Sequence, residues 1–85
     1  MDSQLTVPAK LANITPALIL TRLQQRVSKT NARILLDAAK IQTGVRVEDA
    51  VELDKEQAVA LCKRLIAQGG PAFQVGQSLY KEYLL

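Results

Sequence analysis

The sequence predicts an all-α domain, or one that is nearly so: a small bundle of three to four short helices. Of its 85 residues 48% are apolar but only 4% are aromatic, so the core has to be built from Leu, Ile, Val and Ala. The dominant residues Ala, Leu, Gln, Lys, Glu and Arg are all strong helix formers. Apolar residues also recur at spacings of three and four, which is the period of one helix face.

The N-terminal residues 1–14 show the weakest helical pattern. Leu5, Val7 and Leu11 would suit a short strand or an extended arm, but Pro8 would restrict such a strand to an edge. We therefore expect an extended arm over 1–14, packed on the domain or on a neighbouring copy, and a single helical domain over 15–85.

Residues 16–43 carry the strongest helical periodicity. Thr15 and Pro16 are typical of a helix start, and Gly44 is typical of a stop. One interpretation is a single long helix with a coiled-coil-like seam. The repeat of such a seam is seven residues, and this interval separates Leu20, Val27, Ile34 and Ile41.

The other interpretation of this stretch is a helical hairpin, roughly 16–27 and 30–43. Ser28 and Thr30 are cap-type residues in its middle, and each half has the length of an ordinary helix. The hairpin is the favoured interpretation. Residues 32–41 are apolar almost all round, which predicts burial on several sides, either at the centre of the domain or in an oligomer interface.

A helix from 55 to 68 has the clearest local signals. Asp54 and Gln57 match the pattern of a capping box, and Gly69 with Gly70 ends the helix. Cys62 lies on its apolar face, which favours a small core residue over a reactive thiol.

Two segments are ambiguous. Residues 45–53 alternate like a strand at first and then suit one or two helical turns. For the last segment we expect a helix from about Ser78 to Leu84, preceded by an extended or turned piece, since Gly76 weakens a helix.

Positive charge is concentrated in the first half of the chain. The net charge is +3, with +5 over residues 1–46 and −2 over 47–85. On a continuous helix, one stripe would hold Arg22, Arg26, Lys29 and Arg33. This stripe predicts a contact with phosphates or an acidic partner. The competing interpretation is a solvated helix face. The stripe lacks the stacking aromatic residues that proteins use to bind single-stranded nucleic acid.

Few residues in the sequence support catalysis. There is no His and only one Cys, and the four glycines match neither nucleotide nor dinucleotide motifs, so we expect no enzyme activity, no metal and no cofactor. The acidic group Glu48, Asp49, Glu52 and Asp54 is expected to be a solvated surface. A helix-turn-helix over 39–53 is disfavoured, because that acidic group would repel phosphates.

These features predict a non-enzymatic interaction, adaptor or regulatory protein that acts through an apolar helical interface with itself or a larger protein. The alternative is a small dimeric nucleic-acid-associated regulator that uses the basic stripe. The N-terminus lacks the features of a signal peptide and apolar runs are short, so we expect a cytoplasmic protein without a membrane span. The side chains expected in the apolar interface or core are Leu35, Leu36, Leu79, Tyr83 and Leu84.

Overall fold

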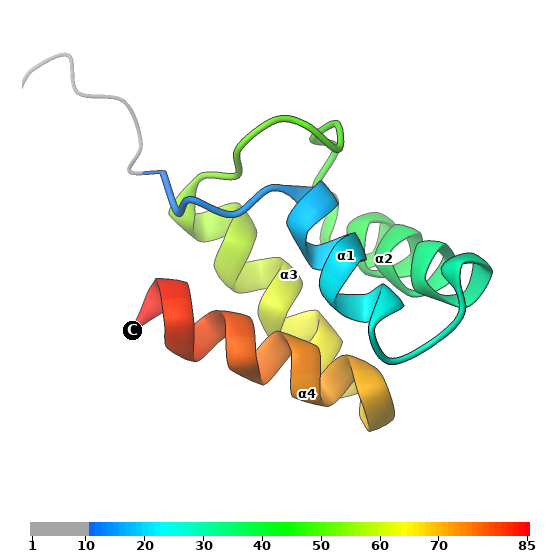
Figure 1. The fold of residues 1–85 in the computed structure, drawn as a ribbon. Helices are drawn as coiled ribbons and strands as arrows, with labels where there is room; N and C mark the ends of the chain where they lie inside the picture. The colour runs from blue at the N-terminus through cyan, green and yellow to red at the C-terminus, as the bar shows by residue number, and fades with distance from the viewer. Residues whose placement is uncertain (1–10) are drawn as a thin grey trace, which may run out of the picture.

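The computed structural model describes residues 11–85, and within them the chain folds as an all-helical bundle, as predicted (Figure 1). Its elements are α1 (Pro16–Gln24), α2 (Lys29–Thr43), α3 (Lys55–Gln68), α4 (Gly70–Leu79) and a closing π-helical turn, η2 (Tyr80–Leu84).

The central stretch is a hairpin, so the single-helix interpretation is wrong. Thr15 caps α1 by accepting a hydrogen bond from the N–H of Leu18 at 3.1 Å, and Pro16 lies in its first turn. Ser28 caps α2 in the same way, because its Oγ accepts from the N–H of Asn31 at 3.2 Å. Of the two cap-type residues in mid-stretch, Ser28 therefore separates the helices, whereas Thr30 lies in the first turn of α2.

The start of α3 has the predicted capping box. Asp54 Oδ1 accepts from the N–H of Gln57 at 2.8 Å, and Gln57 Oε1 accepts from the N–H of Asp54 at 3.1 Å. At the other end, Gly69 has a φ of 79°, a left-handed value that glycine adopts without strain. It leads directly into α4, so α3 and α4 form a tight helical corner.

The extended piece expected before Ser78 is wrong, because α4 begins at Gly70. Pro71 lies in its first turn, where a missing N–H costs nothing. Gly76 does not break the helix: a Cβ at this position would lie 2.7 Å from the carbonyl oxygen of Cys62 on α3. Glycine is therefore present because the two helices approach closely. The residues expected to be helical at 78–84 are helical, as the end of α4 followed by η2.

Residues 45–53 form neither a strand nor a helix but a loop that joins α2 to α3. Val45 and Leu53, near its two ends, are buried in the core. Between them, the N–H of Val51 donates to the carbonyl of Glu48 at 3.0 Å to close a turn. The early alternation of apolar residues thus reflects a loop with an inner and an outer side.

The described part of the N-terminal segment, residues 11–14, is not helical, bends at Asn13, whose φ is 60°, and lies against the end of this loop. The N–H of Leu53 donates to the carbonyl of Ile14 at 2.8 Å, and the N–H of Ala12 donates to the carbonyl of Leu53 at 3.1 Å. Ala12 and Ile14 are buried. The rest of the expected arm, residues 1–10, lies outside the described residues.

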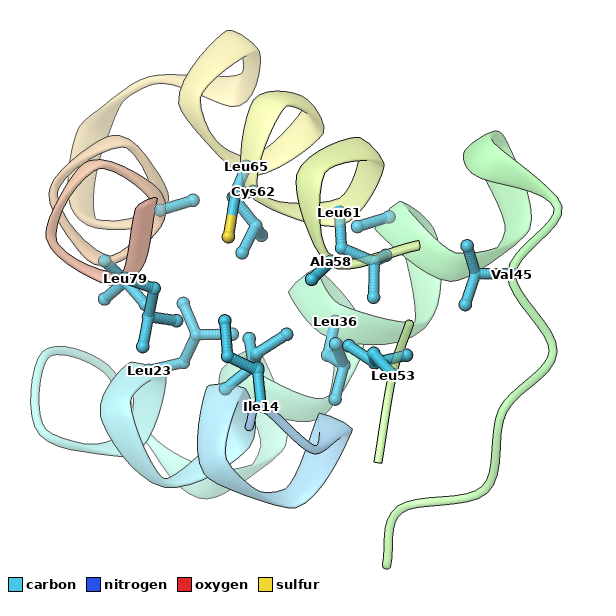
Figure 2. Packing of buried hydrophobic residues seen from close by; sticks show 14 of the residues in the cluster. Ile14, Leu23, Leu36, Val45, Leu53, Ala58, Leu61, Cys62, Leu65 and Leu79 are labelled. Atoms are coloured by element: carbon cyan, nitrogen blue, oxygen red, sulfur yellow. The ribbon is translucent and has the colours of Figure 1, made fainter. Parts of the chain in front are cut away.

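The helices are arranged as a ring around one aliphatic core. Helix α1 packs on α2 and α4, and α3 packs on the same two helices from the other side. Side chains from the described elements meet in the middle of the ring (Figure 2). The largest fully buried ones include Ile14, Ile19, Leu23, Leu36, Leu53, Leu61, Leu65 and Leu79. No polar or charged side chain is buried among residues 11–85, so the core depends on apolar packing alone.

Candidate functional site

The four basic residues of the predicted stripe do not form one stripe, because α1 and α2 are separate helices. Arg22 makes a two-pronged ion pair with Glu82 of η2, with Nη2–Oε1 and Nη1–Oε2 distances of 2.8 and 3.1 Å. Arg26 donates a hydrogen bond to the side chain of Gln74 on α4. Lys29, the first residue of α2, is exposed. Arg22 thus joins α1 to η2, and Arg26 joins the turn after α1 to α4. Phosphate binding by the four residues stays a prediction.

Arg33, the fourth member, fastens the α2–α3 loop to α2. Its Nη1 lies 2.7 Å from Oδ2 of Asp49, its Nη2 lies 3.1 Å from Oδ1 of the same carboxylate, and Nη2 also lies 3.2 Å from Asp37. The hydrogen bonds from Arg33 lower the pKa of Asp49 below its ordinary value of 3.8, and the charges of Arg33 and Lys40 add to the effect. The backbone carbonyl of Asp49 accepts from the N–H of Ala17 at 2.9 Å, so the same residue also joins the loop to α1.

Replacing this carboxylate should change how stability depends on pH. A lowered pKa means that Asp49 stabilises the fold above its unfolded-state pKa and that this contribution is lost as pH falls through the folded-state value. Asp49→Asn should therefore lower the free energy of unfolding at neutral pH, and the difference from wild type should shrink as pH falls into the acid range in which the folded-state carboxylate becomes protonated. The side chain is 42% exposed, so solvent limits the effect to about 1 kcal/mol or less.

Urea denaturation of both proteins across this pH range measures that difference. Glu48→Gln, which changes the neighbouring exposed carboxylate, is the matched control. If the difference in free energy of unfolding between Asp49→Asn and wild type stayed constant as the pH was lowered, the ion pair would not be the cause of that difference.

Helix α2 is not covered on all sides, so the expectation that it lies at the centre of the domain is wrong. Its buried residues are Ala32, Leu36 and Ala39. On the opposite side, Ile34 is 59% exposed and Ile41 is 80% exposed. The other expectation for this helix, an oligomer interface, stays a prediction.

An open hollow of about 540 Å³ lies beside this exposed side, between the C-terminal half of α2 and the start of the loop. Ile41, Val45 and Val47 give it apolar walls. Gly44 and four charged side chains complete its lining. Two of the charged residues are acidic and two are basic, so the formal net charge of the hollow is zero: Asp37, Glu48, Lys40 and Arg46. We call Ile34 together with this hollow the outer α2 surface.

The residues predicted for an apolar interface or core lie in different places. Leu36 and Leu79 are fully buried and Leu84 is 7% exposed, so these three belong to the core of the domain. Leu35 is partly buried against the core, and Tyr83 is 37% exposed on η2. Sequence reasoning did not select the exposed Ile34 and Ile41 as site residues. Their seven-residue spacing was the available signal.

The acidic group is less solvated than predicted, because three of its members have structural roles. Asp49 pairs with Arg33, and Asp54 caps α3. Glu52 accepts from the N–H of Asn13 at 2.7 Å and so helps to hold the N-terminal segment. Over residues 11–85, no three His, Cys, Asp or Glu side chains are grouped so that they could hold a metal ion.

Cys62 is a core residue, as its position on the helix predicted. It is fully buried on α3 among aliphatic side chains (Figure 2), and burial raises the pKa of its thiol to about 11. The thiolate that would react is therefore scarce at neutral pH.

No protein-family model, no curated protein and no solved structure matches this chain. In the part of the chain that the structure describes, none of the helices is both long and apolar enough to span a membrane.

Proposed function

We propose that this chain is a non-enzymatic interaction protein, an adaptor or regulatory subunit, that binds another protein chain through its outer α2 surface. The observation that carries the proposal is the exposure of Ile41, which is 80% accessible at the edge of a hollow that has both apolar and charged walls. Ile34 extends the same surface along the helix. Exposed apolar side chains that gather beside a hollow are typical of a binding surface, whereas single ones are common on any protein.

Burial of this surface would supply binding energy without loss to the fold. Covering one isoleucine side chain is worth about 1.5–3 kcal/mol, which corresponds to about tenfold or more in affinity. The core needs neither Ile34 nor Ile41, because the buried side of α2 consists of Ala32, Leu36 and Ala39. The outer side chains are thus free to serve a partner.

Affinity capture with three baits tests this proposal. Wild type, Ile41→Asp and Leu85→Asp would each be immobilised and exposed to a lysate of cells that make the protein. Leu85 is 87% exposed at the C-terminus, which lies away from α2 (Figure 1), so its substitution is a matched apolar-to-acid control. Circular dichroism would confirm that all three baits are folded.

We expect a protein that wild type and Leu85→Asp retain and that Ile41→Asp loses by about tenfold or more. Identical capture by all three baits, or capture lost equally in both variants, would contradict the assignment of binding to this surface.

A further inference from the structure

We propose that the partner of the outer α2 surface is a second copy of this chain, packed against the first across a twofold axis near Ala38. This inference rests on the proposed function and names its partner.

The charge of the surface suits contact with itself. A twofold axis brings the same patch to both sides of an interface, so a patch of one sign would repel its copy. The hollow is lined by Asp37 and Glu48 on one hand and by Lys40 and Arg46 on the other, which gives no net charge. Each copy therefore offers both signs to the other. A nucleic acid, or a strongly acidic or basic peptide, would require an excess of one sign.

The geometry of α2 supplies a protruding side chain and a hollow on the same face. Ile34 is 59% exposed and lies seven residues before Ile41, which borders the hollow. Residues seven apart lie on one side of a helix. When two such helices meet in antiparallel fashion about a point near Ala38, Ile34 of each copy comes to lie beside Ile41 and the hollow of the other.

Ala38 makes a close approach feasible at the centre of this contact. It lies midway between the two isoleucines and has only a methyl side chain. Interaxial distance between packed helices depends on the side chains at the crossing point, so alanine there allows the isoleucines on either side to interlock.

Disulfide trapping tests the position of the axis. In the full chain, Ala38→Cys should form an interchain disulfide under mild oxidation, because equivalent residues beside a twofold axis come within the roughly 4.4–6.8 Å that a disulfide spans between Cα atoms. The native Cys62 is buried and should remain unreacted. Ala67→Cys, an exposed alanine on α3, is the matched control and should stay monomeric on a non-reducing gel.

Light scattering over a concentration series gives the second readout. Wild type should shift from monomer to dimer mass as concentration rises, and Ile41→Asp should weaken the dimer by about tenfold or more. A wild-type protein that stays monomeric at every concentration, or equal disulfide formation by Ala67→Cys, would overturn the inference.

These outcomes are separable from those of the capture experiment. The wild-type protein could be monomeric in light scattering and still capture a different protein that Ile41→Asp does not retain. That pair of results would refute self-association and leave the proposed binding surface in place. A dimer that Ile41→Asp does not weaken would refute the inferred interface, whatever the capture experiment shows.

Discussion

Leu36→Ala is expected to lower the free energy of unfolding by about 2–5 kcal/mol. Leu36 is fully buried on the inner side of α2, and its side chain points into the core beneath α3 (Figure 2). Truncation removes apolar contacts and leaves a cavity that rigid neighbouring helices fill only in part. For a domain whose total stability is of the order of 5–15 kcal/mol, this loss is a large share.

Ile34→Ala is the control for this substitution, because it removes a similar side chain from the same helix on the exposed side. Ile34 is 59% exposed, so its truncation should change stability by no more than about 0.5 kcal/mol. Urea denaturation at low protein concentration compares the two variants while self-association contributes little. Equal losses would mean that the inner and outer sides of α2 are wrongly assigned.

Gly76→Ala should also destabilise the fold, by about 1–3 kcal/mol, although alanine is the better helix former. The new Cβ would lie 2.7 Å from the carbonyl oxygen of Cys62 and 3.0 Å from Cβ of Leu65. Both obstacles belong to α3 and neither is the flexible end of a side chain. Helix α4 must therefore move away from α3, and the packing of Leu79 would loosen with it.

Thermal and urea denaturation of Gly76→Ala measure this loss, and about 1 kcal/mol should lower Tm by roughly 4–8 °C in a domain of this size. Ser78→Ala changes an exposed residue of the same helix and should raise stability by a few tenths of a kcal/mol. A stabilising effect of Gly76→Ala would show that α3 and α4 are farther apart than described.

The parts of the fold that were predictable depend on local signals. The capping box of Asp54 and Gln57 marks α3 because its hydrogen bonds join residues three apart. Ser28 separates α1 from α2 for the same reason. Gly76 was misleading because its cause is tertiary: within α4 alone it looks like a helix breaker, and only contact with Cys62 explains it.

The candidate site was less predictable, because it depends on which side of each helix is covered. Arg22 looked like a free cation, but its partner Glu82 is 60 residues away in the sequence. Helix α2 is apolar on nearly every side, so its sequence does not reveal that Leu36 faces the core while Ile34 and Ile41 face outward. That distinction arises only when the other helices pack.

The pairing of residues 11–14 with the end of the α2–α3 loop has a consequence for the order of folding. The hairpin of α1 and α2 and the corner of α3 and α4 need only neighbouring residues, whereas Asn13 and Glu52 are 39 positions apart. Closing so long a segment has an entropic cost that is repaid only when both halves are in place. We expect these contacts to form after the main barrier, so weakening them should accelerate unfolding and leave the folding rate almost unchanged.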